Sequence, residues 1–384
     1  MTLMAPFDTI TSNRDLAART SEKPVIGYLA NTVPHEMIRA AGAFAQQITG
    51  SPEDETPDAL QHMEPFFDGW VLSVFQRMLD GRLSHLSALV IPRTSEVMLQ
   101  LYYFILEYKR QNPKAGFPSP ILFDILHTPY DATARYNAGR LARLRDRLGQ
   151  ISGTAMTQES LTQAIDQADE IRGLLAQINA LRTADSPTLS GAEMQRITLA
   201  ASLMAPDEFS EAAKNLIFAG GTGQRNGPRM VLTGSGHDTD GFHQLVESQG
   251  AIITSDNHMH GDWRFLAPVG QGDPMQALLT KYHRNAPSTR SYPRAMNDAR
   301  LIEAAERGQA KACIFFTEEW DDALGFDFPT QRDLLADRNI PVLFLKNQSY
   351  RAPDRAAQSE QIAQFLADLS SAPRSPIHKS EAVQ

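Results

Sequence analysis

Short runs of apolar residues alternate along this chain with longer stretches in which apolar residues recur every three or four positions. In the first third, apolar runs at residues 25–30, 88–91 and 121–126 are separated by helical patterns at residues 34–41, 63–79 and 96–109. Short runs that are apolar throughout are typical of strands buried on both faces of a sheet. Their alternation with helices predicts a doubly wound unit, with parallel strands covered on both sides.

The same alternation returns in the last third, after a long stretch without strand patterns. Apolar runs occur at residues 230–233, 251–253, 311–316 and 342–345, and helical patterns at residues 241–248, 297–307, 330–338 and 354–369. Between the two halves, residues 131–218 are rich in Ala, Leu and Gln at helical spacing, most clearly over 157–181. A coiled coil is the rival interpretation of that stretch, but its apolar positions do not sustain heptads for long enough.

These patterns predict an α/β protein with two doubly wound parallel-sheet domains joined by a helical segment. We expect an N-terminal extension at 1–23, a first α/β domain at 24–150, a helical connection at 151–225, a second α/β domain at 226–371 and a flexible tail at 372–384. Because the carboxyl ends of the strands gather at one edge of such a sheet, ligand-binding residues are expected in the loops at that edge.

Charge and cysteine content narrow the possible functions. A formal net charge of -9 argues against nucleic acid as a partner, because that affinity depends on clustered Lys and Arg. No stretch approaches the roughly twenty uninterrupted apolar residues of a membrane span, and residues 1–22 lack the features of a signal peptide, so we expect a cytoplasmic protein without membrane contact. The single cysteine, Cys313, lies in the apolar run 311–316 and is expected to pack inside a strand.

Polar side chains mark two strand-to-helix corners of the first half. The corner after residue 30 carries Asn31, Thr32, His35 and Glu36, and the corner after residue 91 carries Ser95 and Glu96. The catalytic candidates are His35, Ser95 and Glu96, with His35 the natural acid-base group because imidazole titrates near neutrality. The plainer alternative for His35, a first-turn helix residue that faces water, is favoured over the catalytic one.

In the second half, the turn at residues 234–238 follows a strand and precedes a helix. Backbone amides at Ser235 and Gly236 are candidates to bind an anion there, although the turn lacks the full dinucleotide fingerprint and a tight connection is the plainer interpretation. If the ligand carries a diphosphate, Arg264, Arg290 or Arg294 could supply positive charge to it. We take Ser235, Gly236, Arg264 and Arg294 as the cofactor-binding candidates.

A metal site is the weaker interpretation of the next loop. Residues 256–262 offer His258 and His260 with flanking carboxylates, which are suitable ligands for zinc, iron or manganese, and the acidic residues at 318–322 could join them in space. Two ligands so close in sequence rarely complete a site, so a hydrogen-bonded turn is favoured. The acidic residues are better explained as a helix start, and no metal ligand is predicted.

Four segments, taken in order, resemble the 2-hydroxyacyl-CoA dehydratase and benzoyl-CoA reductase family, specifically its smaller catalytic subunits. They are IGYLANTVPHEMIRAAG, LDGRLSHLSALVIPRTSEVMLQLYYF, VLTGSGHDTDGFHQLVESQGAIITSDNHMHGDWRF and FDFPTQRDLLADRNIPVLFLKNQ, and the resemblance spans residues 24–369. It implies two related subunits, each with a [4Fe-4S] cluster on cysteines, and an ATP-dependent activator that supplies one electron. It also implies a CoA thioester substrate that is either dehydrated or reduced in an aromatic ring.

The sequence departs from that family where the cluster cysteines are expected. Thr94-Ser95-Glu96 stands at one such position, Tyr292-Pro293-Arg294 at another, and the third falls around Trp320-Asp321. We therefore expect a subunit of a dehydratase-like or reductase-like complex that acts on an acyl-CoA, has no cluster of its own and pairs with a related cysteine-bearing subunit, which carries the [4Fe-4S] cluster. Two alternatives stay open: a structural or regulatory subunit, and an independent cluster-free acyl-CoA lyase or binding protein that uses the loops of His35 or of His258 and His260.

Overall fold

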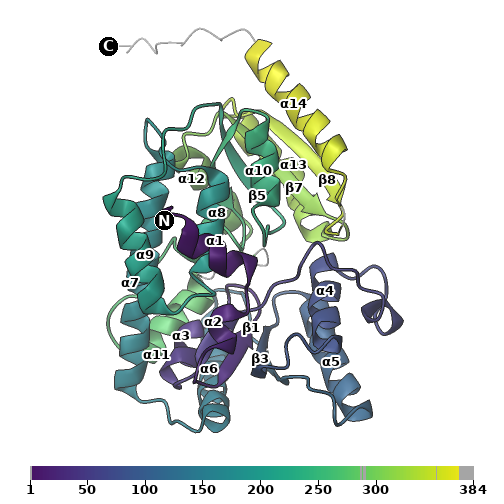
Figure 1. Cartoon of the computed structure of the whole chain (residues 1–384), viewed down its shortest axis with the longest axis vertical. Coiled ribbons are helices and arrows are strands. Elements are labelled where there is room, and N and C mark those ends of the chain that lie inside the picture. The colour runs from purple at the N-terminus through teal and green to yellow at the C-terminus, as the bar shows by residue number, and fades with distance from the viewer. Residues whose placement is uncertain (1, 286–287, 289–290, 352, 372–384) are drawn as a thin grey trace.

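Two four-stranded parallel sheets organise the chain in the computed structural model, which describes residues 2–285, 288, 291–351 and 353–371 (Figure 1). The first sheet has the order β2-β1-β3-β4, with β1 Val25–Tyr28, β2 Phe44–Gln47, β3 Leu86–Pro92 and β4 Ser119–Phe123. The second has the order β6-β5-β7-β8, with β5 Arg229–Gly234, β6 Ile252–Asn257, β7 Ala312–Glu318 and β8 Val342–Gln348. All strand pairs are parallel, so the predicted α/β fold with two parallel sheets is confirmed. The predicted tail at 372–384 and Arg290 lie outside the described residues.

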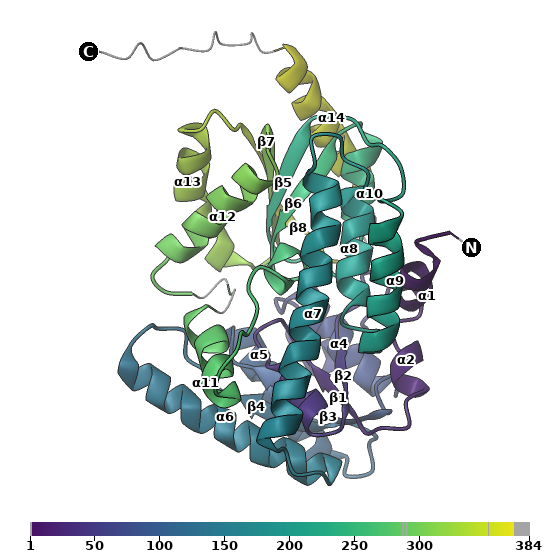
Figure 2. The same cartoon turned by 90° about the vertical axis from the view of Figure 1, so that its left-hand side faces the viewer.

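Helices precede, link and cover the two sheets (Figure 2). The first half has α1 Ala5–Ser12, α2 Leu16–Arg19, α3 His35–Ala40, α4 Gly69–Leu79, α5 Glu96–Gln111 and α6 Asp131–Ser152. The middle has α7 Gln158–Thr183, α8 Gly191–Ala200 and α9 Pro206–Phe218. The last part has α10 Gly241–Ser248, α11 Pro274–Leu279, α12 Ala295–Arg307, α13 Asp322–Ala336 and α14 Arg355–Ser371.

Alternating residues of each strand pack against helices on opposite faces of the first sheet. Ile26 and Val90 belong to a core with α3, α6 and α11, whereas Leu29 and Leu89 belong to a core with α4 and α5. The central strands are therefore buried on both faces, which explains why their sequences are apolar throughout rather than alternating.

The second sheet is covered in the same way. One face packs on α10 and α14, and the other packs on α12 and α13. Cys313 faces the second of these cores from β7, beside Val231, Leu301 and Leu335, and is fully buried. The expectation that Cys313 packs inside a strand is confirmed.

The helical middle of the chain forms a third core and extends beside both sheets. Helices α7, α8 and α9 enclose residues such as Ile178, Ile197 and Phe209 together with Phe7 of α1. Helix α7 also contacts α3 next to the first sheet and β6 in the second. Helix α11 follows β6 in the chain but packs on the first sheet. The division of the chain at residues 150 and 225 stays a prediction.

Strand β2 is the element that the hydrophobic pattern does not indicate. Its sequence FAQQ ends in two glutamines, yet Gln46 and Gln47 are both buried. The Gln46 side chain donates a hydrogen bond to Asp15 at 2.8 Å and contacts His85 at 2.8 Å, while the Gln47 oxygen accepts one from Arg264. These contacts satisfy both polar groups of the Gln46 side chain and the side-chain oxygen of Gln47, whereas Gln47 Nε2 is buried without a partner among the described residues.

Candidate functional site

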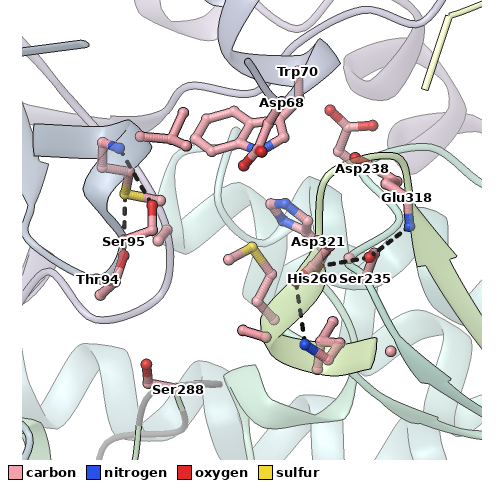
Figure 3. A pocket seen from close by; sticks show the side chains of 18 of the residues that line it. Asp68, Trp70, Thr94, Ser95, Ser235, Asp238, His260, Ser288, Glu318 and Asp321 are labelled. Carbon is pink, nitrogen blue, oxygen red and sulfur yellow. Dashed lines mark hydrogen bonds between the residues drawn. The ribbon is translucent and has the colours of Figure 1, made fainter. Parts of the chain in front are cut away.

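A cavity of about 330 Å³ lies between the carboxyl ends of the two sheets (Figure 3). Loops after β1 and β3 line it from the first sheet, and loops after β5, β6 and β7 line it from the second. Figure 3 shows Thr94 and Ser95 on one side, Ser235 and Asp321 on the other, and His260 between them. This is the edge at which open α/β sheets bind their ligands.

The lining of this interdomain cavity is acidic. Its carboxylates are Asp68, Asp238, Glu318, Glu319, Asp321 and Asp322, and no lysine or arginine occurs among the described residues that line it. Burial raises the pKa of Asp238, and burial together with the charge of Asp238 raises the pKa of Glu318 well above its usual range. Raised pKa values favour protonated carboxyls, so the cavity is less negative than its composition suggests and is poorly suited to a diphosphate.

Ser95 lines the cavity and also holds the start of α5. Its hydroxyl oxygen accepts a hydrogen bond from the Met98 amide at 3.2 Å, which makes it the N-cap of the helix. The Thr94 hydroxyl contacts the Met98 sulfur at 3.1 Å. Glu96, the other candidate of this corner, is exposed on the first turn and does not line the cavity.

Because Ser95 caps α5, its replacement should lower stability. We expect Ser95→Ala to reduce the free energy of unfolding by about 1 kcal/mol, since the cap satisfies an otherwise unpaired amide. Ser95→Asp should retain most of the stability, because aspartate caps helices equally well. Urea unfolding of the three proteins measures the difference, and equal stability of Ser95→Ala and the original protein would contradict the capping role.

Ser235 connects the ends of the two central strands of the second sheet. Its hydroxyl donates to Asp321 at 2.8 Å and accepts from the Glu318 amide at 2.9 Å, and its own amide donates to the Phe316 carbonyl at 2.9 Å. Gly236 allows close approach of the next loop, because a Cβ there would lie 2.7 Å from the Met259 side chain. Helix α10 begins only at Gly241, so neither Ser235 nor Gly236 belongs to its amino-terminal turn.

A second, smaller cavity of about 50 Å³ adjoins the first and shares Asn31 and Trp263 with it. His35 and Arg264 line this smaller cavity. His35 stacks on Tyr28 at a ring distance of 5.7 Å, and burial lowers the pKa of His35 to about 3. The ring is therefore neutral at pH 7, unlike the half-protonated imidazole that motivated its choice as an acid-base candidate.

Arg294 lies apart from both cavities. Its side chain is exposed, approaches Asp298 at 3.8 Å and donates to Thr330 at 2.8 Å. Of the four predicted cofactor-binding residues, the structure thus places Ser235 and Gly236 at the interdomain cavity, Arg264 at the smaller cavity beside it, and Arg294 on the surface.

Comparison with known proteins decides the family. Residues 31–367 match the model of the family described as 2-hydroxyglutaryl-CoA dehydratase, D-component. The chain belongs to this dehydratase D-component family. It is 23% identical over 337 residues to the (R)-phenyllactyl-CoA dehydratase beta subunit of Clostridium sporogenes, covering 85% of this chain and 87% of that protein. It is also 23% identical over 355 residues to one of the benzoyl-CoA reductase subunits of Thauera aromatica, covering 88% of each. The predicted family is confirmed, and both relatives are subunits of larger enzymes.

The donor atoms of this D-component homologue do not fit a thiolate-bound iron-sulfur cluster. The corners at Thr94-Ser95 and Trp320-Asp321 line the interdomain cavity with hydroxyl, indole and carboxylate groups. Tyr292, at the third expected position, is 54% exposed and does not line the cavity, whereas Ser288 does. Cys313 is buried in the core of β7, where burial raises the pKa of its thiol. Fe-S clusters need several thiolates, and the described residues that line this cavity supply none.

The two histidines of the loop after β6 have different surroundings. His260 lines the interdomain cavity, while His258 turns into a fully buried group with His243 and Asp256. The potential ligand atoms of His243, Asp256 and His258 all lie within 4.8 Å of one another, which is close enough to hold a metal ion. However, the His243 ring already contacts Asp256 at 2.8 Å, and the second Asp256 oxygen accepts from Arg182. These contacts form an ion-pair network that joins α7, α10 and β6.

Helices that could cross a lipid bilayer are absent from the described residues, since none is both long and apolar enough.

Proposed function

We propose that this D-component homologue is the cluster-free subunit of a 2-hydroxyacyl-CoA dehydratase-like or benzoyl-CoA reductase-like complex. It pairs with a related subunit that carries cysteines and the [4Fe-4S] cluster, and an ATP-dependent activator supplies that subunit with an electron. This chain contributes the interdomain cavity to the binding of a CoA thioester. As part of such a complex it takes part in a lyase or oxidoreductase reaction.

The observation that carries this proposal is the donor set of the interdomain cavity. The chain has two parallel sheets and the cavity lies at the carboxyl ends of both, but the lining offers oxygen and nitrogen donors in place of thiolates. Burial raises the pKa of Glu318 well above its usual range, and a protonated carboxyl there can donate a hydrogen bond. Such a donor suits the carbonyl oxygen of a thioester, which a charged carboxylate would repel.

Metal and sulfide content tests the proposal directly. We expect the protein purified alone under anaerobic conditions to contain no stoichiometric iron or acid-labile sulfide. The complex with a cysteine-bearing D-component relative and its activator should contain iron and sulfide and should consume an acyl-CoA. A cluster bound at one equivalent to the isolated chain would overturn the assignment.

Turnover of an acyl-CoA by the complex and by the protein alone separates this proposal from the two alternatives. A structural or regulatory subunit would leave the turnover unchanged when Asp238→Ala or Glu318→Ala replaces the original chain in the complex, whereas the proposed role requires a loss. An independent lyase or binding protein, using His35 or His260, would act on an acyl-CoA without iron and without a partner. The family match and the donor set of the cavity, with a raised pKa at Glu318, support the subunit role over both alternatives.

A further inference from the structure

The smaller cavity beside the interdomain one carries an excess of buried positive charge. Its cationic side chains are Arg39, Arg172, Arg264 and Lys281. Two carboxylates contact this group, Glu36 and Asp169, and both of them pair with the same guanidinium, that of Arg172. From these charges we infer that the basic cavity is a binding site for one small oxyanion, a carboxylate or a phosphate group.

Three of the four cations lack a counter-charge within the described part of the chain. Among these residues, no carboxylate lies within ion-pair distance of Arg39, Arg264 or Lys281, in contrast to Arg172, whose guanidinium lies 2.6 Å from Asp169. Four positive charges thus face two negative ones. Isolated charges are costly to bury, because a low-dielectric interior cannot replace their hydration, and an anion of matching geometry offsets that cost.

Hydrogen-bonding capacity points the same way. The Nη1 atom of Arg39 is buried without a partner among the described residues, and Arg264 reaches the neutral side-chain oxygens of Gln47 and Tyr28. Lys281 donates to the carbonyl of Ala267, which also carries no charge. Guanidinium groups present paired donors that match carboxylate and phosphate oxygens, so cations with only neutral partners define the class of ligand.

Burial has measurable consequences for these cations. Desolvation lowers the pKa of Arg39 and of Arg264, and desolvation together with the charge of Arg172 lowers the pKa of Lys281 to about 8.

The size of the basic cavity limits the ligand. Its volume of about 50 Å³ exceeds the roughly 15 Å³ that one water requires and suits a group of a few atoms rather than a nucleotide.

The cavity also has a connection to the proposed substrate site. It shares Asn31 and Trp263 with the interdomain cavity, and it shares Arg39 with an open surface cavity on its other side. The oxyanion is therefore either a group of the acyl-CoA itself, reaching across Asn31 and Trp263, or a free anion that enters past Arg39. The site exists in both cases and does not depend on the proposed function.

Anion titration of the full chain tests this inference. Inorganic phosphate and acetate are titrated calorimetrically at constant ionic strength maintained with chloride, into the original protein and into Arg264→Gln and Arg294→Gln. Arg294→Gln is a matched control, because it removes the same charge from an exposed site outside the cavity. We expect saturable binding of at least one anion, at least tenfold weaker in Arg264→Gln and within twofold of the original protein in Arg294→Gln.

Competition identifies the source of the anion. If the oxyanion that the basic cavity binds is part of an acyl-CoA, phosphate should weaken the binding of glutaryl-CoA competitively. If it is a free anion, phosphate and glutaryl-CoA should bind at the same time. Either result supports the anion site. Absence of saturable anion binding by the original protein would overturn the inference, as would equal affinity of Arg264→Gln. Because these titrations involve no iron, sulfide or turnover, their failure is distinguishable from failure of the proposed function. Lys281→Met supplies a second variant should Arg264→Gln not fold.

Discussion

Arg182→Met should destabilise the protein by about 3–5 kcal/mol, because it leaves Asp256 buried without its guanidinium partner and Asp262 with Arg307 as its remaining cation. Arg182 is fully buried in α7 and donates to Asp256 of β6 and, at 2.7 Å, to Asp262 after that strand. Both carboxylates are 1% exposed, so water cannot replace the lost contacts. Such a loss is a large fraction of the total stability of a typical protein. Urea unfolding at neutral pH measures it.

A surface ion pair on the same helix supplies the control. Lys214 of α9 contacts Glu170 of α7 at 2.7 Å, with side chains that are 60% and 48% exposed, so Lys214→Met should cost less than about 1 kcal/mol. Restoring neutrality with Asp256→Asn and Asp262→Asn in the Arg182→Met background should recover part of the loss. If Arg182→Met is as stable as Lys214→Met, the network does not hold α7 against the second sheet.

The hydrophobic pattern predicted the central strands because burial on both faces makes the residues of each strand apolar. Residues such as Ile26 and Leu89 are apolar since helices cover both faces of the sheet, and this is visible in the sequence. Strand β2 was missed because the buried Gln46 and Gln47 find their hydrogen-bond partners in Asp15, His85 and Arg264, which are distant in sequence. The docking of α11 on the first sheet is a tertiary contact that no periodicity encodes.

The candidate site was predicted only in part, for a similar reason. Ser95 and Ser235 follow strands, so the topology alone brings them to the interdomain cavity. Asp68 and Tyr350 line the same cavity, but Asp68 falls within the helical pattern at 63–79, and Tyr350 follows the apolar run at 342–345 without a motif to mark it. The pairing of His258 with His260 was suggested by their spacing, whereas the structure groups His258 with Asp256 and with His243 of helix α10. Spacing reveals neighbours within one loop and cannot reveal groups assembled across elements.

Departures from ordinary pKa values were equally inaccessible to the sequence. His35 was chosen because imidazole titrates near neutrality, and burial lowers its pKa to about 3. The basic cavity arises from Arg39 in α3, Arg172 in α7 and Lys281 after α11, which are far apart along the chain. Desolvation and charge clustering depend on three-dimensional packing, so these electrostatic features emerge only from the fold.

Gly234→Ala should reduce the free energy of unfolding by about 2–5 kcal/mol, because the strand end that it occupies has no room for a side chain. A Cβ at Gly234 would lie 1.9 Å from the Phe316 carbonyl oxygen of β7, and the residue has a φ of +116°. The two strands would have to separate where Ser235 joins Asp321 and the Glu318 amide. Gly153→Ala is the matched control: its φ is +73° and nothing lies within 4 Å of its Cβ position, so only the backbone cost of about 1 kcal/mol applies. Equal losses in the two variants, measured by urea unfolding, would show that close strand packing at the interdomain cavity is not what requires Gly234.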